Sequence, residues 1–332
     1  MGRDSLMLWS RMEHLHEHKA IMQTPIVNFK DAQLGDGSRI SDIVGNVDRA
    51  LSECGFMACS NLGFSDELIQ RVFKASATFF LSDQKNKIRS AYLSAEENFG
   101  YQAFASEHLD PTNPPDLKET FTMRNILNAT IADNRWPSVE FKELMQHFFA
   151  ECLERALFLQ KILARALNLD EGFFVKFHSG QNISLRLLHY PACDSSELQD
   201  SQLGAGAHTD YGLTTFLFQD SVGGLEICDK NGDWQTIKPD KSVVLINSGD
   251  LLERWTNGKY RSTLHRVKPM TRGKDRFSIA FFVDPDSDTE IKVLESCIDA
   301  GTPQKFSDIN AGEYIQGKLE NSHVDFQKEG TL

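Results

Sequence analysis

Hydrophobic residues recur at helical spacing in three stretches of the N-terminal half. Between residues 40 and 54 the apolar positions fall on one stripe, which is the pattern of an amphipathic helix. A helix-capping sequence begins at Ser65, and hydrophobic residues continue from it to Phe80. A third stretch opens around Pro137 and keeps its apolar periodicity to about Leu167. It predicts a long helix that packs along a sheet as its support.

The pattern changes after Gly180 to short runs of β-branched and aromatic residues between Gly, Asp, Asn and Pro turns. Six of these runs predict strands, at 183–190, 213–219, 225–228, 242–247, 262–267 and 277–283. Two shorter strands are expected in the N-terminal half, at 25–29 and 56–59. Several short strands without long helices between them indicate an antiparallel sandwich or jelly roll. We therefore predict a mixed α+β fold with a jelly-roll core, a helical N-terminal region and a long supporting helix.

No repeat, low-complexity tract or clear linker divides the chain, so we expect one compact unit. Its predicted parts are a leader at 1–24, an N-terminal helical and mixed region at 25–135, the jelly-roll core at 136–320 and a tail at 321–332. A helix at 306–319 is expected to fold back over the core.

Between residues 94 and 124 the chain is rich in Gly, Pro, Asn and aromatic residues. The run from Pro111 to Pro115 is incompatible with a regular helix. A long irregular segment inside a compact protein is usually functional or a linker. Its aromatic residues favour a functional loop.

Composition excludes several classes of partner. The net charge is −12 and no basic patch is visible, which argues against nucleic-acid binding. No apolar run reaches the length of a membrane span. The six cysteines are scattered, which is typical of reduced intracellular thiols. We therefore expect a soluble cytoplasmic protein that acts on a small molecule, without a nucleic acid, a membrane or an obligate protein partner.

His208 and Asp210 are the first candidates for chemistry. On an extended strand, residues two positions apart point to the same face, so both side chains converge on one point. A second histidine from a distant strand, His265, would complete two imidazoles and one carboxylate on one face of a metal. That set is typical of non-haem Fe(II), because it leaves positions open for oxygen and a co-substrate. A lone strand histidine is more often a core residue, and only the joint pattern favours the metal.

Arg276 and Ser278 share one face of a later strand. The planar guanidinium and the hydroxyl suit a carboxylate ligand. A buried arginine without a carboxylate partner is costly, so an anionic ligand is expected. The alternative is a structural ion pair with an internal Asp or Glu.

These residues belong to longer motifs with a family resemblance. The motifs are the stretches 182–191, 208–212, 249–252 and 276–278. Together they resemble the isopenicillin N synthase-like branch of the Fe(II)/2-oxoglutarate-dependent oxygenases, and are most similar to the thymine dioxygenase type, over about residues 25–319.

The resemblance implies a double-stranded β-helix (jelly-roll) core and Fe(II) bound by His208, Asp210 and His265. It also implies that Arg276 and Ser278 bind the distal carboxylate of 2-oxoglutarate and that Tyr190 helps to bind this co-substrate. Where many plant members carry an asparagine, this chain has Leu188, and Asn182 is the candidate to replace it.

The implied reaction oxidises an unactivated C–H bond of a small metabolite, by hydroxylation, desaturation or ring closure, with O2 consumed and succinate and CO2 released. One alternative is an iron oxidase that uses no 2-oxoglutarate, in which Arg276 and Ser278 bind a substrate carboxylate. The other is a non-catalytic sensor on the same fold.

Six residues are candidates for the substrate wall. They are Tyr101, Phe121, Arg124, Arg186, His189 and Trp255. For each of them plain packing is an equal expectation, and Arg186 could be a structural ion-pair partner. If either arginine lines the pocket, a substrate carboxylate or polarised carbonyl becomes plausible.

Overall fold

One large sheet of eight strands and a smaller sheet of four form the core of the computed structural model, which describes residues 24–30, 32, 37–271, 273–299 and 301–322. The large sheet has the order β1-β2-β10-β7-β12-β5-β4-β3, and the small sheet has the order β6-β11-β8-β9. The strands of these two sheets are β1 (Ile26–Asn28), β2 (Phe56–Ser60), β3 (Phe99–Gln102), β4 (Glu119–Arg124), β5 (Ser184–Tyr190), β6 (Ala205–His208), β7 (Thr214–Gln219), β8 (Leu225–Cys228), β9 (Trp234–Thr236), β10 (Val243–Ser248), β11 (His265–Val267) and β12 (Arg276–Val283). A separate pair is formed by β13 (Glu290–Ile291) and β14 (Ile309–Asn310).

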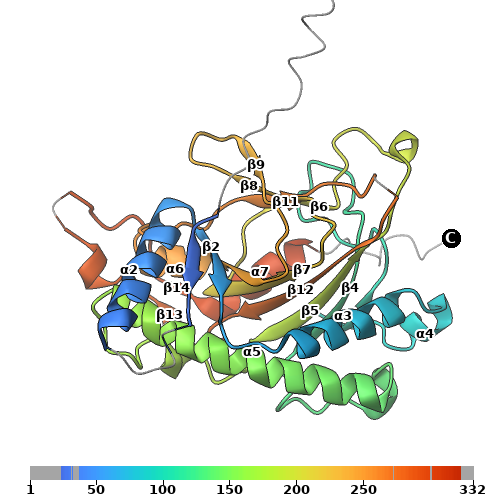
Figure 1. Cartoon of the computed structure of the whole chain (residues 1–332), viewed down its shortest axis with the longest axis horizontal. Coiled ribbons are helices and arrows are strands. Elements are labelled where there is room, and N and C mark those ends of the chain that lie inside the picture. Colours follow the sequence, from blue (N-terminus) through green and yellow to red (C-terminus); the bar gives the residue numbers. More distant parts are fainter. Residues whose placement is uncertain (1–23, 31, 33–36, 272, 300, 323–332) are drawn as a thin grey trace, which may run out of the picture.

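Helices cover the outer face of the large sheet and close one end of the molecule. They are α2 (Gly37–Glu53), α3 (Asp66–Phe80), α4 (Gln84–Ile88), α5 (Val139–Ala166), α6 (Asp250–Trp255) and α7 (Ala311–Ser322). The long helix α5 runs beneath the sheet in Figure 1, with α2 and α3 packed beside it. Ser65 and Ser138 cap α3 and α5 by accepting hydrogen bonds from the backbone N–H groups of Leu68 and Phe141. No helix of the described residues is long and apolar enough to cross a membrane.

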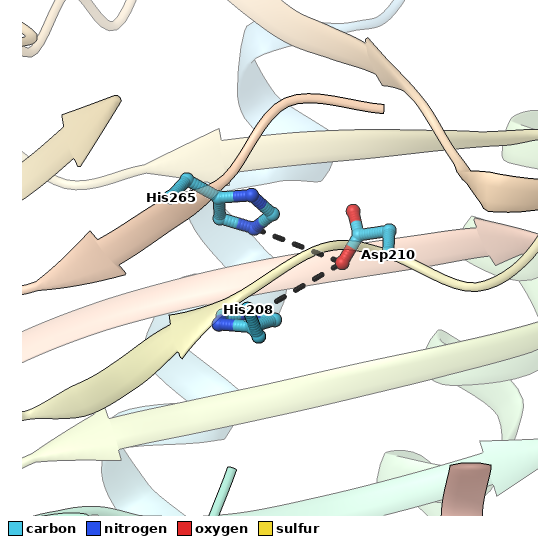
Figure 2. A group of neighbouring side chains, drawn as sticks. All are labelled: His208, Asp210 and His265. Carbon is cyan, nitrogen blue, oxygen red and sulfur yellow. Dashed lines mark ion pairs between the residues drawn. The ribbon is translucent and has the colours of Figure 1, made fainter. Parts of the chain in front are cut away.

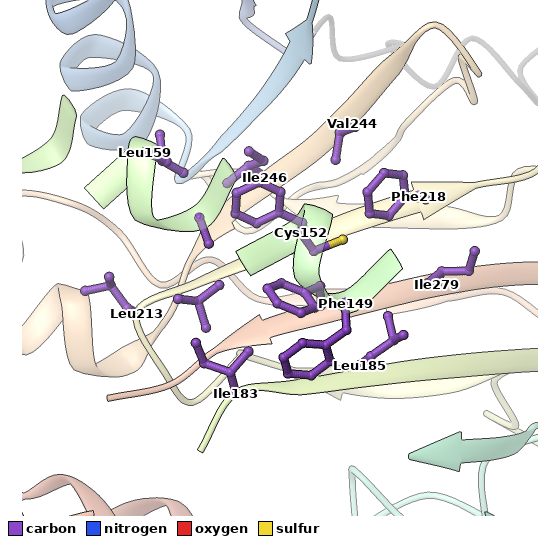
Figure 3. Packing of buried hydrophobic residues seen from close by; sticks show 14 of the residues in the cluster. Phe149, Cys152, Leu159, Ile183, Leu185, Leu213, Phe218, Val244, Ile246 and Ile279 are labelled. Atoms are coloured by element: carbon purple, nitrogen blue, oxygen red, sulfur yellow. The ribbon is translucent and has the colours of Figure 1, made fainter. Parts of the chain in front are cut away.

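The packing of α5 decides which face of each strand is left for function. Phe149, Cys152 and Leu159 of α5 lie against strand residues such as Leu185 and Ile279 (Figure 3). Side chains alternate between the two faces of a strand, so the even-numbered residues of β5 and β12 point the other way. That second face looks toward the small sheet, and a cavity lies between the two sheets.

The expected fold class, its long helix and its strand-rich second half are confirmed, with two corrections. The segment 94–124 is not irregular throughout, because β3 and β4 form an antiparallel pair at one edge of the large sheet. The last helix begins at Ala311 instead of residue 306, and β14 precedes it. The predicted N-terminal region at 25–135 contributes β1 to β4 to the sheet that contains β5, β7, β10 and β12. The predicted leader and most of the tail lie outside the described residues.

Candidate metal centre and co-substrate pocket

Three side chains with metal-ligand atoms meet between the two sheets. His208 ends β6, His265 begins β11, and the two residues are paired in register. Asp210 follows two residues after His208 and turns back toward both imidazoles (Figure 2). Its Oδ1 lies 4.0 Å from His208 Nε2 and 3.7 Å from His265 Nε2. One ligand atom from each residue falls within 4.8 Å of the others, which is the spacing of a metal site.

Backbone carbonyls fix the orientation of both imidazoles. His208 Nδ1 lies 2.7 Å from Gly206 O, and His265 Nδ1 lies 3.0 Å from Thr263 O. A carbonyl oxygen only accepts, so we assign the proton to Nδ1 in each ring. Each Nε2 then keeps its lone pair and faces Asp210, as a metal-binding histidine requires.

The charge state of the site also suits a cation. Burial, and after it the neighbouring His265, lower the pKa of His208 to about 3. Burial alone would raise the pKa of Asp210, but the two imidazoles and hydrogen bonds from Asn247 and Thr215 outweigh it and lower the pKa. A neutral His208 imidazole and an Asp210 carboxylate are therefore available at neutral pH, and together with the His265 imidazole this donor set fits Fe(II).

The turn that carries Asp210 is held by the start of α6. The N–H groups of Asp250 and Leu251 donate to Asp210 O and Tyr211 O, at 2.8 and 3.1 Å. The two segments approach so closely that a Cβ at Gly249 would lie 2.4 Å from Gly212 O. Glycine at position 249 is therefore required for the approach, which explains the motif at 249–252.

Asn247 supports the site and was not predicted from the sequence. It is buried on β10, and its Nδ2 donates to Asp210 Oδ2 at 2.7 Å. This bond leaves Oδ1 facing the histidines. No short motif marks the position, because Asn247 and Asp210 are 37 residues apart in the sequence and meet only through the pairing of β10 with β7.

We expect Asn247→Ala to weaken metal binding about 10- to 100-fold, because partners that orient a ligand typically contribute that much. Calorimetric titration of the metal-free protein with Fe(II) under argon measures the change. Asn231→Ala, in an exposed turn, is the matched control. An unchanged dissociation constant in Asn247→Ala would contradict this supporting role.

Arg276 is almost completely buried, with 1% of its surface exposed. It donates to Ser278 Oγ and to Gln219 Oε1, and its guanidinium lies over the Tyr190 ring, 4.7 Å from the ring centre. All of these partners are neutral. Among the described residues no carboxylate pairs with Arg276, and its Nε has no hydrogen-bond partner. The alternative of a structural ion pair is therefore not realised, and the side chain is left with capacity for an anion in the cavity.

The cavity between the sheets has a volume of about 130 Å³. Residues from both sheets and from α7 line it, including the three candidate metal ligands, Arg276 and Ser278. Of the six residues expected on the substrate wall, Arg124 and Arg186 line this cavity.

The expectation of a wall position is wrong for the other four. His189 is three residues after Arg186 on the same strand, so the alternation of β5 turns it to the helical side, where it stacks on Phe277. Tyr101 and Phe121 also face that side and pack against Phe79. Trp255 packs among phenylalanines outside the sheet. Phe121 and Trp255 therefore have the packing role of the alternative, whereas Tyr101 and His189 also form hydrogen bonds with the buried Glu119 carboxylate.

Arg186 has a structural partner as well as a place on the wall. Its guanidinium forms an ion pair with Glu107, and Lys118 Nζ lies 3.1 Å from the same carboxylate. Lys118 also contacts Asp116 at 2.5 Å, and Asp116 accepts a hydrogen bond from Gly206 N at 2.8 Å. This buried chain of alternating charges connects β5 to the strand that carries His208.

Asn182 lies at the far end of β5 from Tyr190. Its Nδ2 donates to Pro285 O and to Ser287 Oγ, both at 2.9 Å. Tyr190 is paired with Arg276, whereas Asn182 is eight residues away along the chain, roughly 26 Å in an extended strand. Asn182 nevertheless lines the same cavity as Arg276, so its role in binding the co-substrate in place of the residue at 188 stays a prediction. Leu188 lies beside Ser278.

Comparisons with known proteins agree with this geometry. Residues 181–285 match the 2OG-Fe(II) oxygenase superfamily, and residues 24–139 match the family described as non-haem dioxygenase in morphine synthesis N-terminal. A 2-oxoglutarate-Fe(II) type oxidoreductase of Emericella nidulans is 30% identical over 315 residues, which cover 90% of each chain. Proline hydroxylase buaE of Petromyces alliaceus is 31% identical and covers 81% of this chain and 90% of its own.

A solved structure extends the likeness to three dimensions. The crystal structure of full-length thymine 7-hydroxylase of Neurospora crassa with α-ketoglutarate, which is 2-oxoglutarate, has a TM-score of 0.82 at 30% identity. The match covers 92% of this chain and 98% of that one. The resemblance to the thymine dioxygenase type is thus confirmed. The chain belongs to the 2OG-Fe(II) oxygenase superfamily and is an Fe(II)- and 2-oxoglutarate-dependent dioxygenase with a jelly-roll core.

Proposed function

We propose that this dioxygenase oxidises an unactivated C–H bond of a small metabolite, with His208, Asp210 and His265 holding Fe(II) and with Arg276 and Ser278 binding the distal carboxylate of 2-oxoglutarate. Hydroxylation, desaturation and ring closure are all compatible with the site. Relatives bind unlike molecules, since one is named a proline hydroxylase and the Neurospora crassa enzyme has been solved with thymine, so their names alone do not select the substrate.

One observation carries the co-substrate assignment. Arg276 is a buried cation that faces the cavity without a carboxylate partner in the described part of the chain. Leaving a buried charge unpaired is costly, so the position favours a bound anion. Ser278, two residues later on the same strand face, adds a hydroxyl beside it.

The residues of the chain would bind the metal and the co-substrate, orient the ligand atoms and shield the reacting centre from water. When bound, Fe(II) and 2-oxoglutarate supply the oxidising chemistry, with release of succinate and CO2. His208 and His265 present their Nε2 atoms, and Asp210 presents the oxygen that Asn247 leaves open. Ile315 and Leu319 of α7 lie on the cavity wall and would exclude water from the reacting centre.

The test is an anaerobic titration of the Fe(II)-loaded protein with 2-oxoglutarate, monitored by the weak visible charge-transfer band of the chelated co-substrate. We expect the band to appear and saturate. Iron binding without the band would overturn the co-substrate role and favour an oxidase in which Arg276 and Ser278 bind the substrate's own carboxylate. Absence of iron binding would favour the non-catalytic alternative.

A further inference from the structure

Arg124 and Asp284 are two charged residues of the cavity wall whose charges act on each other without direct contact. In the part of the chain that the structure describes, Arg124 has no ion pair and the Asp284 carboxyl receives no hydrogen bond. The hydrogen-bond donors of Arg124 and the acceptor oxygens of Asp284 are therefore available to a ligand in the cavity.

The sheet register places this pair at one end of the cavity. Arg124 of β4 is paired with Ser184 of β5, which is paired with Phe282 of β12. Two strand spacings separate Arg124 from Phe282, which is about 10 Å between their Cα atoms. Asp284 comes two residues after Phe282, just beyond the end of β12, and both charged side chains line the same cavity.

Asp284 also lies beside the turn that carries a candidate metal ligand. A Cβ built at Gly212 would lie 1.7 Å from Asp284 Oδ1, so glycine leaves the space that the carboxyl uses. Gly212 is two residues after Asp210. A ligand that contacts Asp284 would thus lie next to the metal centre.

The pair is separate from the co-substrate end. Arg276 begins β12 and Asp284 follows its last residue, Val283, so their Cα atoms are separated by the length of the strand, at most roughly 26 Å at about 3.3 Å per residue. A five-carbon dicarboxylate held by Arg276 is far too short to reach Asp284. Arg124 and Asp284 therefore remain for the substrate.

The surroundings combine one more polar atom with apolar side chains. Thr122, two residues before Arg124, is 4% exposed, and its Oγ1 has no hydrogen-bond partner among the described residues. Ile315 and Leu319 of α7 cover the cavity from the other side. Such a wall suits a molecule with one polar edge and an otherwise apolar body.

We infer that the substrate is an electroneutral small molecule whose polar edge carries a hydrogen-bond acceptor beside a donor, as in a carboxamide, a lactam or a cyclic imide. Its carbonyl oxygen accepts from Arg124, and its N–H donates to Asp284. This inference rests on the proposed function, because it assigns the remaining part of the same cavity to the substrate.

Charge balance disfavours a carboxylate at this position. The second wall arginine, Arg186, already pairs with Glu107, and above pH 7 the ionised Asp284 carboxylate balances the charge of Arg124. A carboxylate that reached Arg124 would face the Asp284 carboxylate, and like charges across a buried contact select against that ligand. A neutral amide keeps both charges balanced.

The experiment compares two probes of nearly the same shape, benzamide and benzoate, with the Fe(II)- and 2-oxoglutarate-loaded protein under argon. Binding is measured by saturation-transfer NMR of the probes at pH 8, because burial and the neighbouring Asp210 raise the pKa of Asp284 to about 7. We expect benzamide to bind at least about tenfold more tightly than benzoate. Asp284→Asn should remove or reverse this preference, whereas Asp288→Asn, at an exposed carboxylate four residues further on, should leave it unchanged.

Equal binding, tighter binding of benzoate, absence of binding by both probes, or a preference that survives Asp284→Asn would each overturn the inference. The charge-transfer titration in the same sample separates this failure from failure of the proposed function. A normal 2-oxoglutarate band without the amide preference rejects only the substrate class. Loss of the band rejects the co-substrate role, and the probe preference is then measured with the Fe(II)-loaded protein alone.

Discussion

Replacing Asp210 by alanine is expected to abolish turnover and leave the fold intact. The variant removes the carboxylate that both imidazoles face, so the donor set falls from three groups to two. The lost hydrogen bond to Asn247 costs about 1–3 kcal/mol, which is small beside the ~5–15 kcal/mol stability of a typical domain. Succinate release, Fe(II) binding by calorimetry and the thermal unfolding midpoint of the metal-free protein test the three parts of this expectation.

Asp288→Ala provides the control for Asp210→Ala, since it removes an exposed carboxylate without a role in the site. His208→Ala should match Asp210→Ala in losing activity, because it removes a second ligand atom from the same group. Retained turnover in either ligand variant would refute the proposed metal centre.

Arg276→Gln should raise the apparent KM for 2-oxoglutarate strongly. Removing one partner of a buried, hydrogen-bonded charge pair costs about 2–5 kcal/mol. This corresponds to a loss of affinity between about 30-fold and several thousand-fold. Glutamine keeps a polar group near Ser278 and Tyr190, so the local packing is largely preserved. Succinate formation against 2-oxoglutarate concentration, with metal affinity measured in parallel, isolates the effect.

Arg155→Gln, on the outer helix α5, is the matched control, because Arg155 pairs with Glu151 and Glu154 away from the cavity. Only Arg276→Gln should shift the co-substrate dependence. An unchanged KM there would show that Arg276 binds something other than 2-oxoglutarate.

The sequence was sufficient for features that depend on local periodicity. The stripe of α2, the caps of α3 and α5 and the even-numbered face of β12 all follow from spacing along one segment. Arg276 and Ser278 were therefore placed together correctly. His208 and His265 are 57 residues apart, and only the joint motif brought them together before the pairing of β6 with β11 was known.

The predictions of site residues failed for two reasons. The alternation of side chains along a strand was overlooked, or the position depended on which distant strands become neighbours. Arg186 and His189 differ by three positions on one strand, and alternation forbids both from lining the same cavity. Asn247 and Asp284 depend on which strands become neighbours, which no local pattern in this chain encodes. The strands β3 and β4 were missed because their glycine- and proline-rich surroundings resemble a loop.

The ends of the cavity wall come from parts of the chain that contribute nothing to the metal triad. Thr122 and Arg124 lie on β4, and Ile315 and Leu319 lie on α7, whereas every candidate metal ligand falls between residues 208 and 265. Substitutions in β4 or α7 can therefore change the cavity wall without replacing any of the candidate metal ligands. Under the proposed function, this separation would let the substrate change while the metal centre stays the same.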